Sequence, residues 1–174
     1  MNNDFNLQLF QSLLSSNNNE RKMAEENFNK VKDLPFKDSI KIFLSGLESQ
    51  DPKVQNITIV LMKKTYLDSK GYYDLIDDES KLELKKLIFS LVNFDRNLLY
   101  LNRLGDFLSK MYSHSTSNLS ELLGYVVKTF ESELDIARQF AIYIIESLCE
   151  LGVLKDDIVE GSIENFSVVF RKGK

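Results

Sequence analysis

Residues 51–55 read Asp-Pro-Lys-Val-Gln, and residues 56–64 continue Asn-Ile-Thr-Ile-Val-Leu-Met-Lys-Lys. Asp51 can accept hydrogen bonds from the free amide groups of a first helical turn, and Pro52 fits a position where a helix needs no donor. Apolar groups then recur at three- and four-residue steps, on Val54, Ile57, Thr58, Leu61 and Thr65. The stretch predicts a capped amphipathic helix over about 52–67, buried along that stripe.

The same pattern, a polar turn followed by an amphipathic helix, recurs at residues 17–21, 95–99 and 133–138. When Arg21, Gln55, Leu99 and Arg138 are taken as equivalent, the interval between repeats is about 34 to 44 residues. Units of this length, with two helices each, predict an α-solenoid in which each pair buries its apolar face against its neighbours.

The composition of the 174-residue chain is that of a globular helical protein. It is 43% hydrophobic and 28% charged, which argues against disorder, and its seven Gly and two Pro favour long helices over a sandwich or barrel. The net charge of −4 disfavours direct nucleic-acid binding and favours basic partners. The start of the chain lacks a signal-peptide pattern, and the longest apolar run, 140–145, is too short to insert into a membrane.

The predicted helical pairs occupy about 4–33, 36–67, 79–113 and 118–151, and a half repeat follows at 155–170. A capping box at Ser80 and Glu83 predicts the start of one helix, and Gly152 the end of another. Natural arrays end in a polar capping repeat, whereas residues 166–170 are mostly apolar. We therefore expect one solenoid domain over 1–174 that is the N-terminal piece of a longer array. In the alternative, the last helix packs sideways and closes the domain.

The sequence offers no catalytic or cofactor-binding constellation. His114 is the only histidine and lies in a Ser/Thr-rich joint, where we expect exposure without function. With one histidine and one cysteine, a metal site of the usual zinc type is not expected. Cys149, which as a lone cysteine fits a reducing compartment, is expected to fill the core. We predict no enzyme activity and no cofactor.

Several short motifs resemble the N-terminal HEAT repeats of the importin-beta superfamily, most nearly the branch containing importin five. Residues 9–15 and 19–25, ending in Ala24-Glu25, resemble the first repeat of that family. Residues 61–64 resemble the end of its second repeat, and residues 104–110 partly match its third, with Gly105 where Cys is usual. Gln55 and Leu99 replace an Arg that is common in HEAT repeats.

The resemblance implies a right-handed superhelix of about four and a half HEAT repeats, built from antiparallel helix pairs whose second helices line the concave surface. It implies a nuclear transport receptor that shuttles between cytoplasm and nucleus and binds Ran in its GTP form on that surface. It also implies basic cargo proteins and the Phe-Gly repeats of nuclear pore proteins as partners.

Candidate Ran contacts are surface residues of the second helices in the first three pairs. They are Asn27, Lys30, Asn56, Ile59, Lys63, Lys64, Tyr66, Arg103, Asp106 and Lys110.

The alternative function is a HEAT scaffold that assembles a phosphatase, a kinase or another multiprotein complex. Such a scaffold predicts co-purification with a catalytic subunit that does not depend on nucleotide. The Ala24-Glu25 signature favours the transport receptor, because a generic scaffold does not need it. A solenoid that is an enzyme or a nucleic-acid binder is disfavoured by the acidic charge and the single histidine.

Overall fold

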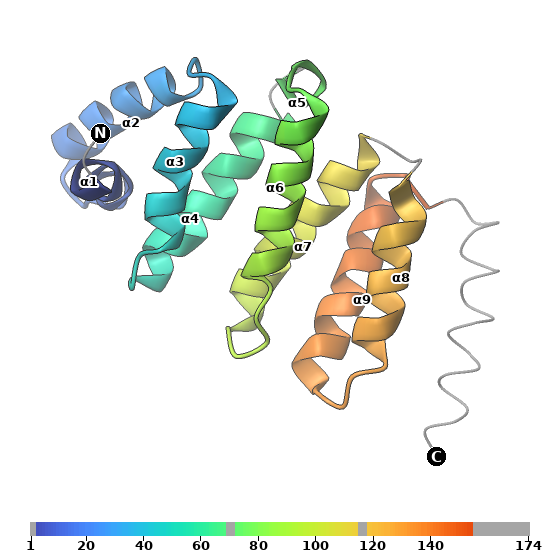
Figure 1. The fold of residues 1–174 in the computed structure, drawn as a ribbon. Helices are drawn as coiled ribbons and strands as arrows, with labels where there is room; N and C mark the ends of the chain where they lie inside the picture. Colours follow the sequence, from blue (N-terminus) through green and yellow to red (C-terminus); the bar gives the residue numbers. More distant parts are fainter. Residues whose placement is uncertain (1–2, 69–71, 115–117, 155–174) are drawn as a thin grey trace. The chain divides into compact units, whose positions relative to one another are not determined.

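The computed structural model describes residues 3–68, 72–114 and 118–154 (Figure 1). Every regular element within these ranges is a helix, and no strand occurs in them, which confirms the predicted all-helical class. The elements are α1 (Asn3–Leu13), α2 (Asn18–Val31), α3 (Phe36–Leu47), α4 (Pro52–Lys63), the π-helix η1 (Lys64–Asp68), α5 (Tyr72–Leu75), α6 (Asp78–Leu91), α7 (Leu98–Ser113), α8 (Leu119–Phe130) and α9 (Asp135–Glu150). The predicted half repeat at 155–170 lies outside the described residues.

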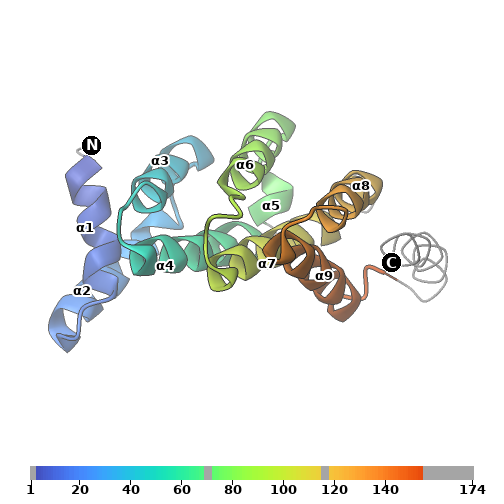
Figure 2. The same ribbon diagram turned by 90° about the horizontal axis from the view of Figure 1, so that it is seen from below.

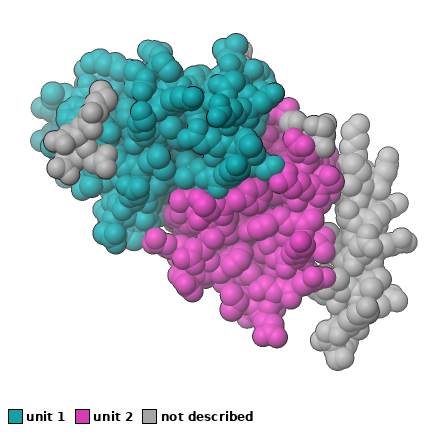
Figure 3. Space-filling view, viewed as in Figure 1, with its two compact units in different colours: residues 1–87 teal, residues 88–174 magenta. Residues whose placement is uncertain are grey.

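The chain separates into two compact units, residues 1–87 and 88–174 (Figure 3). The boundary between them falls inside α6. In the first unit, α1 packs against α2, α3 and α4, and α3 packs against α4. In the second, α9 packs against both α7 and α8. The pairs α3–α4 and α8–α9 are helical hairpins joined by short turns; in Figure 2, α3 lies above α4 and α8 above α9.

Aromatic side chains form the centre of the first unit. The ring of Phe43 on α3 lies 6.1 Å from those of Phe10 on α1 and Phe28 on α2, and 5.4 Å from that of Tyr66 on η1. Phe10, Phe43 and Tyr66 are completely buried. Tilted and edge-on rings at such distances attract one another beyond the burial of their surface. One cluster therefore joins four helical elements.

The buried face of α4 differs from the predicted stripe. Val54, Thr58 and Thr65 are buried as predicted, but Ile57 and Leu61 are only half-buried. Because α4 packs against both α1 and α3, its buried arc is broader than one stripe and includes three further residues, Gln55, Ile59 and Met62.

The continuation of α4 into a π-helix changes the register of the residues that follow. Hydrogen bonds from residue i to i+5 place more residues in each turn than an α-helix does. Within this π-helix, Thr65, Tyr66 and Leu67 are all buried. The prediction that Ile59 and Tyr66 are exposed partner contacts is wrong, since both side chains are 0% exposed.

In the second unit, α9 buries one stripe against its neighbours. Ala137, Phe140, Ile144 and Leu148 are 0% exposed, whereas Cys149 is exposed. The prediction that Cys149 fills the core is wrong. Adjacent residues on a helix point about 100° apart, so a buried Leu148 does not bury the residue after it. Gly152 ends the segment with a φ of +66°, as predicted for a helix stop.

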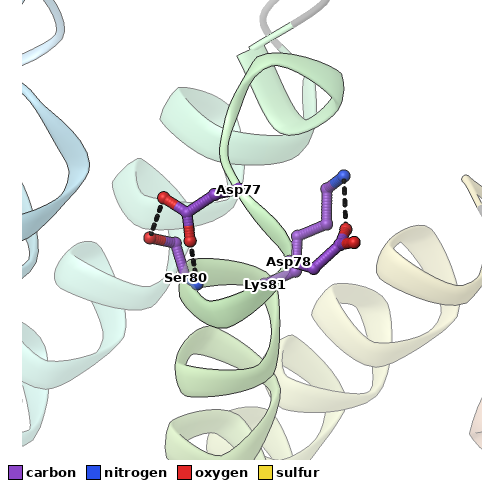
Figure 4. Close-up of polar contacts among 4 residues, drawn as sticks. All are labelled: Asp77, Asp78, Ser80 and Lys81. Atoms are coloured by element: carbon purple, nitrogen blue, oxygen red, sulfur yellow. Dashed lines mark hydrogen bonds and ion pairs between the residues drawn. The ribbon is translucent and has the colours of Figure 1, made fainter.

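The start of α6 is capped by Asp77 and not by the predicted box at Ser80. The backbone N–H of Ser80 donates to Asp77 Oδ1 at 2.8 Å, and the Ser80 hydroxyl donates to Asp77 Oδ2 at 3.0 Å (Figure 4). The helix thus begins at Asp78, before the predicted box. The Asp77 carboxylate directly precedes the helix, and it satisfies the backbone N–H of Ser80, which has no carbonyl partner in the first turn.

We expect Asp77→Ala to lower the thermal midpoint of unfolding more than Asp78→Ala. Asp77 caps the helix, whereas Asp78 only forms an exposed ion pair with Lys81 at 3.5 Å. The backbone and then the hydroxyl hydrogen bonds from Ser80 lower the pKa of Asp77. Its stabilisation is therefore present above the unfolded-state pKa and is lost as the pH falls through the folded-state pKa.

The measurement is thermal unfolding followed by circular dichroism at neutral and acidic pH. The difference in thermal midpoint between the unmodified chain and Asp77→Ala should narrow below about pH 4. If Asp77→Ala and Asp78→Ala lowered the thermal midpoint equally at neutral pH, the assignment of Asp77 as the cap would be contradicted.

Candidate functional site

Three of the turns between paired helices share one arrangement of hydrogen bonds, which we call the turn clamp. In each, a serine hydroxyl accepts the backbone N–H of the residue two positions later, which is the last residue before the second helix. The pairs are Asn17 to Ser15 at 3.1 Å, Asp51 to Ser49 at 3.1 Å and Leu134 to Ser132 at 3.2 Å.

The second part of the turn clamp is a side chain six residues after the serine, which donates to the carbonyl oxygen of that serine. The donors are Arg21 at 3.5 Å, Gln55 at 2.7 Å and Arg138 at 2.6 Å. Gln55 donates as well to Leu47 O at 3.2 Å. The predicted equivalence of these three positions is confirmed, and a glutamine performs the role of the arginine at the second.

The predicted equivalence of Leu99 is wrong. Asn97 caps α7, because its side chain accepts the N–H of Tyr100 at 2.9 Å. The N–H of Leu101 donates to Asn97 O, just as that of Arg21 donates to Asn17 O. Leu101, which is 0% exposed, therefore occupies the equivalent position, while Leu99 is 57% exposed.

Gln55→Ala should lower the free energy of unfolding by about 1–2 kcal/mol, because two buried carbonyl groups lose a donor. The matched control is Gln50→Ala, which changes an exposed glutamine in the same turn and should have little effect. Urea titrations of both variants test this. A Gln55→Ala chain as stable as the control would rule out a structural role for the turn clamp.

In the first unit, the predicted contacts that remain at the surface lie on α2, on α4 and at Lys64, which directly follows α4. Asn27 and Lys30 are exposed, and the Lys30 ammonium donates to Asn27 Oδ1 at 3.3 Å. Lys64 is exposed and Lys63 half-buried. Asn56 is half-buried, and its amide donates to Pro52 O at 2.8 Å within α4. Of the predicted contacts in the first unit, those that remain at the surface are therefore cationic and amide side chains.

In the second unit, Arg103, Asp106 and Lys110 lie at helical spacing on α7 and are all half-buried. The Tyr143 hydroxyl of α9 donates to Asp106 Oδ1 at 2.9 Å. Burial is the first cause that raises the pKa of Tyr143 to about 12, and the hydrogen bond to Asp106 is the second. Asp106 therefore joins α7 to α9 as well as facing the surface.

Sequence reasoning missed Tyr143. Its ring approaches α7 at Gly105, where an added Cβ would lie 3.0 Å from the Tyr143 ring and 3.3 Å from the Phe140 ring. A glycine inside a helical pattern is a signal of close approach by another element, although it does not say which one.

Among residues 3–68, 72–114 and 118–154, no cluster of three or more His, Cys, Asp or Glu side chains could hold a metal ion. No helix in those ranges has both the length and the apolar character needed to cross a membrane. His114 is exposed, as predicted.

No family model, curated protein or solved structure matches this chain. Across the described residues the protein consists of paired helices, and the turn clamp closes three of the turns between them.

Proposed function

We propose that this chain is the N-terminal region of an importin-beta-type nuclear transport receptor and that it binds Ran in the GTP form. The observation that carries the proposal is the turn clamp, which recurs with the same spacing in three helix pairs. A repeated local contact at equivalent positions supports an array of like units, and HEAT repeats in a right-handed superhelix are the array that the sequence motifs resemble.

Each unit carries a set of predicted Ran contacts that remains accessible. On the first unit these are Asn27, Lys30, Asn56, Lys63 and Lys64. On the second unit Arg103, Asp106 and Lys110 contribute. Cationic and amide side chains can hydrogen-bond to acidic and polar groups of a partner, which gives specificity and faster association. Ile59 and Tyr66 belong to neither set, because both are buried.

The same proposal includes import of basic cargo, contact with Phe-Gly repeats and shuttling between cytoplasm and nucleus. The net charge of the chain, −4 at neutral pH, is compatible with basic cargo.

The test is to measure binding of the chain to Ran loaded with a non-hydrolysable GTP analogue or with GDP. We expect binding to the GTP form and much weaker binding to the GDP form. Lys63→Glu on the proposed surface should weaken binding, whereas the control Lys41→Glu on α3 should not. Absent binding would contradict the proposal. Equal binding to both nucleotide forms would also contradict it and would favour the scaffold.

A further inference from the structure

A groove of about 260 Å³ runs between α1 and α2 in the first unit. Ala24 is 3% exposed, and its small side chain leaves the floor of the groove open. The lining comprises Phe5, Gln8, Leu9, Ser12, Glu20, Met23, Ala24 and Asn27. The volume is below the range of about 300–1,000 Å³ that is usual for small-molecule pockets, so the groove suits individual side chains of a partner.

Two large apolar side chains of the lining are mostly in water. Phe5 on α1 is 61% exposed, and Met23 on α2 is 65% exposed. Both helices also carry polar residues that can face the solvent. The exposure of Phe5 and Met23 is therefore not required for α1 and α2 to fold as a pair. Apolar side chains gathered around a concavity and bordered by polar groups are typical of protein-binding surfaces, and Met suits them because it is adaptable.

The groove has one charged lining residue, the carboxylate of Glu20. Its Oε1 accepts a hydrogen bond from Ser12 at 3.0 Å, and its Oε2 accepts one from Ser15 at 2.6 Å. These two bonds, the one from Ser15 first, lower the pKa of Glu20, so the group is ionised at neutral pH. Each oxygen keeps a lone pair for a further donor, and the Glu20 side chain is exposed.

We propose that the α1–α2 groove docks an amphipathic segment of a partner protein that carries an apolar anchor followed by a lysine or arginine. The anchor lies between Phe5 and Met23, and the cation pairs with Glu20. Charge complementarity selects this occupant: the only charge of the lining is negative, it is held in position by two hydroxyls, and no cation of the lining neutralises it. The amides of Gln8 and Asn27 are placed to hydrogen-bond to the backbone or polar groups of the segment.

This inference goes beyond Ran binding, since it assigns a different surface and a different partner. Only Asn27 belongs to both surfaces, and the tests below do not change it. Failure of one proposal is therefore distinguishable from failure of the other.

The experiment is a selection of random peptides displayed on phage against the 174-residue chain, followed by fluorescence polarisation with the enriched peptides. We expect enriched peptides to share an apolar residue and a nearby lysine or arginine. Met23→Glu should weaken their binding at least about tenfold, whereas the control Leu82→Glu, at an apolar residue of α6 that is 46% exposed, should not. Glu20→Gln should weaken binding about two- to fivefold at low salt and less at high salt, with Glu26→Gln as its control.

Several outcomes would overturn the proposal: no enriched sequence, an acidic consensus, or binding that Met23→Glu leaves unchanged. Sedimentation of the chain adds a separate check. If the chain self-associates and Met23→Glu abolishes the self-association, the groove binds a second copy of the chain, and the proposal of a partner protein is overturned. Ran binding is measured in parallel and should survive Met23→Glu. Circular dichroism should show every variant folded, since the altered side chains are exposed.

Discussion

Replacing Tyr66 by alanine should lower the free energy of unfolding by about 3–5 kcal/mol, the range observed for deletion of a large buried aromatic side chain. The side chain is 0% exposed, and its ring lies 5.3 Å from Phe36, 5.4 Å from Phe43 and 5.5 Å from Tyr72. The truncation would leave a cavity where α3, η1 and α5 meet. Urea unfolding of the chain, followed by tyrosine fluorescence and circular dichroism, measures the loss.

Tyr66→Phe is the matched control, because it keeps the ring and removes only the hydroxyl. The lost contact is the hydrogen bond of 2.8 Å between Tyr66 and Ser39, while Ser39 keeps its own bond to Phe36 O at 3.1 Å. We expect a cost of about 1 kcal/mol. Losses near zero for Tyr66→Ala would mean that the residue is at the surface, where the sequence had suggested it.

The helix boundaries could be predicted well because the signals for them are local. Asp51 accepts the N–H of Lys53 at 2.8 Å, and Pro52 begins α4, as the residues themselves indicated. The stop at Gly152 depends on one residue and its φ angle. Where two neighbouring residues can both cap, as at Asp77 and Ser80, a local signal is ambiguous by a few residues.

The buried face of α4 could not be predicted, because a helix with apolar groups on several sides has more than one plausible stripe. Ile57 and Ile59 are the same residue type, and only the positions of α1 and α3 decide which of them is buried. The π-helix at Lys64–Asp68 has no compositional signal. Tyr66 lies seven residues after Ile59 and so near the same helical face, and the burial of both was missed because the sequence pattern assigned another face of the helix to the core.

The two polar features of the site differ in how far the sequence could reveal them. The turn clamp has a local pattern, a serine six residues before an arginine or glutamine, and Ser15, Ser49 and Ser132 could have been recognised from it. The hydrogen bond between Tyr143 and Asp106 joins residues far apart in the chain, and nothing near either one predicts it. The groove between α1 and α2 likewise depends on how the two helices meet.

Gly46→Ala should lower the free energy of unfolding by about 2 kcal/mol or more, although alanine is the better helix former. A Cβ at Gly46 on α3 would collide with Thr58 Oγ1 of α4 and would lie 2.7 Å from the Phe10 ring of α1. Neither neighbour can move easily. The Thr58 hydroxyl is bonded to Val54 O at 2.7 Å, and Phe10 is fully buried against Phe43. Relief of the clash therefore requires the three helices to separate.

The control for Gly46→Ala is Gly124→Ala on α8, where an added Cβ meets nothing within 4 Å. At this exposed helical position alanine should raise the free energy of unfolding by about 0.5–1 kcal/mol, since it reduces the freedom of the unfolded chain. The same substitution should thus have opposite signs in two helices of one protein. Denaturant titrations of both variants decide the matter: a stabilised Gly46→Ala chain would mean that α1, α3 and α4 do not meet at this glycine.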